Sequence, residues 1–153
     1  MTTPMDILAT LALPGDSPAP WPPDDAPPAH NDGLATGVLA CSLPYLGRHA
    51  THVTMREITL PPGGTTGWHY HPGPLLAVVR AGTLTRTFTD WSTETYAEEW
   101  CFVENSGPEH AHIGDNLCNS PLVLYAVYFL PGPDAPLSIE APAPPMSPAP
   151  HES

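Results

Sequence analysis

The middle of the chain consists of short segments rich in β-branched and aromatic residues, and this pattern restricts the fold more than any other feature. Five such segments occupy residues 51–60, 75–80, 83–89, 94–103 and 122–130. Proline and glycine turns such as 61–64 separate them, and no segment shows a sustained helical period. Short strands with frequent turns predict an all-β domain, either a sandwich or a barrel.

The 23 prolines of the 153 residues are concentrated near the two ends. Seven lie between Pro14 and Pro28, and eight between Pro131 and Pro150. Proline lacks a backbone donor and favours extended, solvated chain. We therefore predict a Pro-rich N-terminal tail over 1–32, one folded domain over 33–131 and a Pro-rich C-terminal tail over 132–153. Both tails are expected to be disordered, and residues 1–25 and 138–153 to be dispensable for stability.

The charge balance excludes several classes of partner. Sixteen acidic residues oppose four arginines, and lysine is absent. Such a chain lacks the positive surface that binds nucleic acid or anionic membranes. The apolar run 5–13 is too short to cross a membrane and has no basic flank. Cys41, Cys101 and Cys118 have no C-x-x-C spacing and are predicted to be buried thiols. We expect a cytoplasmic protein that acts on a small molecule.

Two His-x-His pairs, about forty residues apart, are the strongest functional signal. In a strand, residues two apart project from the same face, so His69 and His71 can direct two imidazoles at one point. If the chain is extended through 109–113, His110 and His112 also share a face, which makes a four-histidine metal site possible. If a bulge or turn follows Pro108, His110 points away from it.

The spacing around these pairs resembles the signatures of the cupin superfamily, over roughly residues 50–131. Gly63, His69, His71 and Gly82 fall at the intervals of G-x5-H-x-H-x3-E-x6-G, and His112 with Asn116 reproduces H-x3-N. The resemblance implies a small jelly-roll β-barrel with one divalent metal ion held by His69, His71 and His112. The match has departures: Leu75 stands where the signature has glutamate, and Gly107 and Glu109 replace the proline and glycine of the second motif.

The missing glutamate shapes the functional prediction. An ion held by neutral imidazoles keeps its full charge and is a stronger Lewis acid. The preferred prediction is an enzyme similar to the cupin polyketide cyclases of antibiotic biosynthesis, in which zinc polarises a carbonyl during ring closure. His110 is predicted to be the fourth ligand or the catalytic group that moves a proton.

Other interpretations stay open. A three-histidine dioxygenase with iron or nickel would cleave a dicarbonyl or an enediol, and a non-catalytic cupin would only bind a metal or ligand. His52 is a further candidate for the fourth ligand. Asn116 is expected to tie a strand end to backbone groups. The segment 122–130 is apolar on both faces, so we expect a tail or a second subunit to cover its outer face, and we predict a homodimer.

Overall fold

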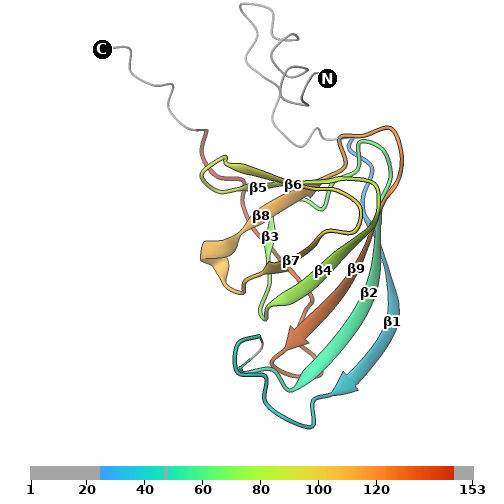
Figure 1. The fold of residues 1–153 in the computed structure, drawn as a ribbon. Helices are drawn as coiled ribbons and strands as arrows, with labels where there is room; N and C mark the ends of the chain where they lie inside the picture. The colour runs from blue at the N-terminus through green and yellow to red at the C-terminus, as the bar shows by residue number, and fades with distance from the viewer. Residues whose placement is uncertain (1–24, 47, 147–153) are drawn as a thin grey trace, which may run out of the picture.

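The computed structural model describes residues 25–46 and 48–146 and contains two five-stranded sheets that face each other (Figure 1). The first sheet has the order β1 (His30–Val38), β2 (His52–Leu60), β9 (Leu122–Leu130), β4 (Leu75–Ala81) and β7 (Cys101–Glu104). The second has the order β10 (Ile139–Glu140), β3 (His69–Tyr70), β8 (His112–Asp115), β5 (Leu84–Phe88) and β6 (Thr93–Tyr96). All pairings between these strands are antiparallel. One turn of 3₁₀ helix, η1 (Pro108–His110), precedes β8.

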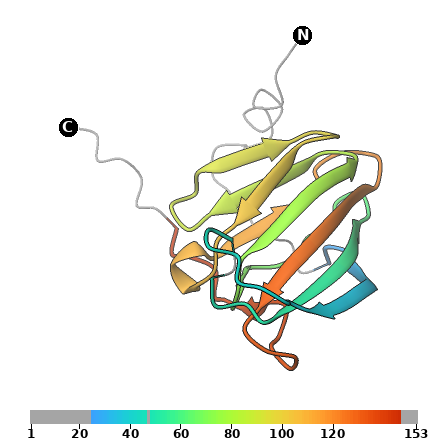
Figure 2. The ribbon, with the colours of Figure 1, turned by 60° about the horizontal axis from the view of Figure 1, so that its bottom comes forward.

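The all-β prediction is confirmed, and four of the five predicted strands match β2, β4, β5 and β9 closely. The fifth, 94–103, is divided into β6 and β7, because Glu99 adopts a left-handed conformation with φ 73° that interrupts the strand. In Figure 2 the strands of the first sheet lie side by side, with β9 between β2 and β4. Strands β1, β3, β8 and β10 carry no strong β pattern and were not predicted. They are defined by their pairing with neighbouring strands.

The hydrophobic core lies between the sheets. It follows from the period of two along β4 and β9, whose alternate residues are buried while most of the residues between them are partly exposed. The buried cluster comprises Leu60, Leu75, Ala77, Val79, Leu84, Phe102, Leu122, Leu124, Ala126, Tyr128 and Leu130. One inner face of the barrel is therefore apolar, and polar side chains can be held only where they have partners.

Gly82 and Gly73 are required by close backbone approach. Gly82 has φ 80°, and a Cβ there would lie 2.7 Å from the carbonyl oxygen of Pro121. A Cβ on Gly73 would lie 1.9 Å from the carbonyl oxygen of Phe129. The glycine that ends the first signature is thus needed for the turn between β4 and β5 to pass the start of β9.

Asn116 ties the end of β8 to backbone groups, as predicted. Its side chain is fully buried, and Nδ2 donates to the carbonyl oxygens of Leu60 at 3.0 Å and Ser120 at 2.8 Å. Its Oδ1 accepts the backbone N–H of Cys118 at 3.0 Å. This asparagine therefore maintains the strand end that follows the third histidine.

The C-terminal segment contributes to the barrel beyond the predicted boundary at residue 131. Strand β10 pairs with β3, and the N–H of Ala141 donates to Trp68. Ala135 and Leu137 pack against the core. Residues 1–24 and 147–153 of the predicted tails lie outside the described part of the chain.

Two further findings concern the surface. The three cysteines are exposed, so the prediction that they are buried thiols is wrong. Cys41 and Cys118 lie on loops, and Cys101 lies on the outward side of β7.

No helix within residues 25–46 and 48–146 is long and apolar enough to cross a membrane.

Candidate metal centre

Three of the four predicted histidines meet on the inner side of the second sheet. His69 on β3 pairs directly with His112 on β8, and His71 follows β3 immediately. The ring centroid of His69 lies 4.8 Å from that of His71 and 4.6 Å from that of His112. The first pair therefore projects to one side, as strand alternation requires, and the antiparallel register brings the third ring to the same point.

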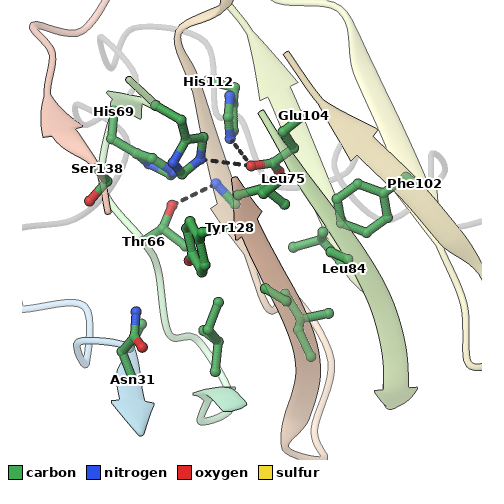
Figure 3. Close-up of a pocket in the computed structure, with 17 residues that line it drawn as sticks. Asn31, Thr66, His69, Leu75, Leu84, Phe102, Glu104, His112, Tyr128 and Ser138 are labelled. Atoms are coloured by element: carbon green, nitrogen blue, oxygen red, sulfur yellow. Dashed lines mark hydrogen bonds and ion pairs between the residues drawn. The ribbon is translucent and has the colours of Figure 1, made fainter. Parts of the chain in front are cut away.

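A carboxylate that the sequence interpretation missed completes the group. Glu104 is the last residue of β7, and its side chain is only 10 % exposed. Its Oε2 lies 2.8 Å from Nε2 of His71 and 3.0 Å from Nε2 of His112. Figure 3 shows Glu104 and His112 pointing toward each other, with His69 beside them. The ligand atoms of His69, His71, Glu104 and His112 all lie within 4.8 Å of one another.

The register between β4 and β7 explains how Glu104 arrives there. Leu75 occupies the signature's glutamate position, and Glu104 is its direct cross-strand partner. The carboxylate is therefore supplied by the neighbouring strand, opposite the expected position. A signal existed in the sequence, because Glu104 directly follows the predicted strand 94–103 and stands two residues after Phe102. The pairing of two distant strands was needed to recognise it.

Backbone carbonyls fix the tautomer of all three imidazoles in their neutral form. Nδ1 of His69 lies 2.8 Å from the carbonyl oxygen of Gly67, and Nδ1 of His71 lies 2.7 Å from that of Leu137. Nδ1 of His112 lies 2.9 Å from the carbonyl oxygen of His110. Because a carbonyl can only accept, each Nδ1 must donate. In the neutral rings Nε2 is then an acceptor that faces the centre of the group.

This arrangement fits a divalent metal ion. Three Nε2 lone pairs and the Oε2 of Glu104 are all acceptors, and acceptors at 2.8–3.0 Å repel one another unless a cation or a proton lies between them. Within the described residues, Nε2 of His112 has no hydrogen-bond partner of good geometry. Imidazole nitrogens and a carboxylate are a donor set that zinc, iron, nickel, copper and manganese accept. The group could therefore hold one ion.

Glu104 also carries an ion pair on its other oxygen. Nη1 of Arg86 lies 3.3 Å from Oε1, and the side chain of Arg86 is 7 % exposed. Burial raises the pKa of Glu104. In the metal-free chain, hydrogen bonds and positive charge from the imidazoles of His112 and His71 when they are protonated outweigh burial and hold the pKa well below its usual value. The carboxylate is thus ionised in this environment.

The fourth predicted histidine, His110, lies elsewhere. It ends η1, and the turn after Gly107 and Pro108 breaks the strand alternation, so His110 and His112 do not share a face. Its side chain is 46 % exposed, and its Nε2 lies 3.8 Å from Oε1 of Glu109. The imidazole lines a surface pocket with Arg48, away from the group, and only its backbone carbonyl takes part, by accepting from His112.

His52 also lies outside the group. Its Nδ1 bonds to the hydroxyl of Thr51 at 2.8 Å, at the start of β2. Among the described residues, the group whose ligand atoms lie close enough to hold one ion does not include His52.

The four groups line one end of a cavity of about 200 Å³. Its walls are mainly apolar, formed by Ile58, Leu75, Ala77, Leu84, Phe102, Leu124 and Ala126. Thr66, Ser138, Asn31 and the buried Tyr128 add polar atoms. Burial raises the pKa of Tyr128 to about 12, so its hydroxyl stays a donor at neutral pH. Asn31 lies at the far end from the histidines (Figure 3).

The pH dependence of the metal-free protein follows from His69. Burial, and then the charges of His112 and His71, lower the pKa of His69 from 6.5 to about 4. The unfolded chain therefore takes up this proton at a higher pH than the folded chain does. The associated stability is complete above pH 6.5 and is lost as the pH falls toward 4, about 2 kcal/mol of it by pH 5.

We expect the Tm of chelator-treated protein to fall between pH 7.5 and pH 5 when measured by scanning calorimetry. His69→Gln should reduce this fall, because it removes the group that titrates. A Tm that is constant over this range in the unmodified protein would contradict the prediction.

Comparison with known proteins gives structural likenesses. No protein-family model matches the sequence, and no curated protein matches it. A cupin domain from Bordetella pertussis Tohama I is similar with a TM-score of 0.44 and 24% identity, over 50% of this chain and 79% of that chain. A Cupin 2 conserved barrel domain protein from Salinispora arenicola CNS-205 has a TM-score of 0.49 and 15% identity, over 66% and 75%.

An oxalate decarboxylase from Lactobacillus farciminis is similar with a TM-score of 0.48 and 17% identity, over 57% of this chain and 26% of that chain. Likenesses of this size decide nothing about activity. The two facing antiparallel sheets and the convergence of His69, His71 and His112 agree with the fold and the histidine ligands that the resemblance in the sequence implies.

Proposed function

We propose that this protein is a metal-dependent enzyme whose substrate is a small organic molecule with two oxygens that can chelate an ion, such as a β-dicarbonyl or an enediol. The observation that supports this is the position of His69, His71, Glu104 and His112 at one end of an apolar cavity. A divalent ion bound there would supply Lewis acidity and stabilise negative charge on a carbonyl oxygen.

The residues that line the cavity can bind and orient the substrate. The apolar walls exclude water and accept the hydrocarbon part of the substrate. The hydroxyl of Tyr128 can donate a hydrogen bond to a further oxygen of the substrate. Binding pockets for drug-sized ligands measure roughly 300–1,000 Å³, and the cavity here is about 200 Å³. The substrate is therefore small.

As a specific reaction we propose the cyclisation of a polyketide chain in antibiotic biosynthesis. The histidine-rich donor set and the apolar cavity support it. Two other observations limit it. Glu104 cancels one unit of the ion's charge, and the cavity restricts the substrate to a short chain. His110, which lines another pocket, has no part in the proposed chemistry.

Oxidative cleavage by a dioxygenase is the second candidate, and the carboxylate of Glu104 favours it. Two histidines and one carboxylate are typical of non-haem iron enzymes that activate oxygen, and the group contains these donors together with a third histidine. The same small cavity suits a dicarbonyl or enediol. Metal identity therefore separates the two candidates: zinc supports the Lewis-acid enzyme, and iron or nickel supports the dioxygenase.

The test begins with metal analysis of protein purified without a histidine tag. Zinc- and iron-loaded protein is then incubated with pentane-2,4-dione, and both the loss of the enol absorbance and oxygen uptake are followed. Turnover without oxygen uptake supports Lewis-acid chemistry, whereas oxygen uptake supports the dioxygenase. Tight metal binding without turnover of any dicarbonyl or enediol would favour a non-catalytic binding protein. Absence of metal binding would overturn the proposal, and His112→Ala serves as the inactive control.

We also propose that two copies associate through the outward side of the first sheet. On this side Val127 pairs with Met55 on β2 and with Leu76 on β4, and Leu76 pairs with Val103 on β7. Met55 is 41 % exposed and Val103 43 %. Chains with a net charge of −12 repel each other, so a contact between copies is favoured where most side chains are uncharged.

Sedimentation velocity tests this association. The unmodified protein should sediment as a dimer and Val127→Glu as a monomer, because the change places like charges in the contact. Thr95→Glu on the exposed face of β6 is the matched control and should remain dimeric. A monomeric unmodified protein would overturn the proposal, and so would a dimer that is unaffected by Val127→Glu.

A further inference from the structure

A buried arginine stands behind the candidate metal centre. Arg86 on β5 is only 6 % exposed. Its guanidinium carbon lies 4.8 Å from the ring centroid of Phe88, 5.4 Å from that of Tyr96 and 4.9 Å from that of Phe102. Aromatic faces attract a cation electrostatically and restrict its movement. The charge of Arg86 is therefore held in one place.

The two ends of the guanidinium have different partners. Nη1 contacts Oε1 of Glu104 at 3.3 Å, on the inside of the barrel. Nη2 contacts Oε2 of Glu94 at 2.7 Å and the hydroxyl of Tyr96 at 3.2 Å. Glu94 is half-exposed, with 48 % of its side chain accessible, so this second set of contacts lies toward the surface. The planar fork of arginine spans both sets, which a single ammonium group cannot do.

The two carboxylate oxygens of Glu104 therefore have different partners. Oε1 accepts from Arg86, while Oε2 faces Nε2 of His71 and of His112. We infer that Arg86 is a positioning residue of the metal centre: it occupies Oε1, so that Glu104 offers only Oε2 to the ion. This inference rests on the metal-binding part of the proposed function.

The consequence concerns the substrate. A carboxylate can bind a metal ion through one oxygen or through both. If Arg86 occupies Oε1, Glu104 contributes one donor atom, and more of the ion's coordination positions stay available to a chelating molecule. The neighbouring positive charge also draws electron density from the carboxylate. Arg86 would then control how Glu104 binds without touching the ion or the substrate.

The experiment measures metal binding by the full-length chain. The dissociation constant for Zn²⁺ is obtained by competition with a chelator, and the visible spectrum of Co²⁺-loaded protein reports the coordination. Arg86→Met leaves an unbranched apolar side chain among the same aromatic rings but removes the charge and the fork. We expect Zn²⁺ binding to weaken by about 10–100-fold and the Co²⁺ spectrum to change, because Oε1 is released.

Two further variants make the test specific. Arg86→Lys keeps the charge but not the fork, so it should also bind Zn²⁺ more weakly than the unmodified protein. Arg80→Met on the exposed side of β4 is the matched control and should retain both the affinity and the spectrum. Melting curves recorded without metal show whether each variant is folded. If Arg86→Met does not fold, Arg86→Lys decides the question.

The results that would contradict the role of Arg86 differ from those that would contradict metal binding itself. Unchanged or tighter Zn²⁺ binding by folded Arg86→Met, with an unchanged Co²⁺ spectrum, would overturn the inference and leave the metal centre intact. Full recovery of both properties by Arg86→Lys would show that charge alone matters, which also overturns it. Failure of the unmodified protein to bind Zn²⁺ or Co²⁺ would instead remove the proposed function on which the inference rests.

Discussion

Replacing Glu104 by alanine is expected to lower the affinity for Zn²⁺ by more than about 100-fold, the upper end of what loss of a partner behind a metal ligand costs. The change removes a candidate ligand that the structure adds to the group, and it also leaves Arg86 buried without the contact that Oε1 of Glu104 provides. His71→Ala should have an effect of similar size, because His71 is 2 % exposed and Leu137 fixes its orientation. Metal content after dialysis and chelator competition measure both effects.

The register between β4 and β7 supplies a sharper control. Leu75 and Glu104 are direct partners, so Leu75→Glu in a Glu104→Leu background returns a carboxylate to the same wall of the cavity. This exchange should recover part of the lost affinity, whereas Glu104→Leu alone should not. Full metal occupancy of the Glu104→Ala protein would show that the carboxylate is not a ligand.

Removing residues 135–153 is expected to destabilise the domain by about 3–5 kcal/mol, from two partly buried apolar side chains and several hydrogen bonds. The deletion removes Ala135 and Leu137 from the core, β10 from the edge of β3, and the acceptor for the indole N–H of Trp91. For a domain of about 100 residues this corresponds to a fall in Tm of more than about 12 °C. Scanning calorimetry measures it.

The same deletion should weaken Zn²⁺ binding by about 10–100-fold, because it removes the carbonyl oxygen of Leu137 that accepts from Nδ1 of His71. A chain that ends at Met146 keeps each of these contacts and is the matched control. A Tm and a Zn²⁺ affinity unchanged by the longer deletion would support the sequence-based expectation that residues 138–153 are dispensable.

Local patterns were sufficient for the parts of the site that depend on neighbouring residues. Two imidazoles separated by one residue face the same way in any strand, which is why His69 and His71 could be paired from the sequence. The predicted turn alternative after Pro108 also depends on local chemistry, and the structure adopts it through η1. The role of Asn116 at a strand end belongs to the same class.

The sequence by itself determined the all-β character, four of the longer strands and the histidines of the first pair, because these depend on propensity and on a period of two. Only the tertiary structure decided that Glu104 joins the group and that the imidazole of His110 does not. Glu104 reaches the histidines through the register of β7 against β4, which are separated along the chain by β5 and β6. Pairing between distant strands is set by the packing of the whole sheet, and no local pattern contains it.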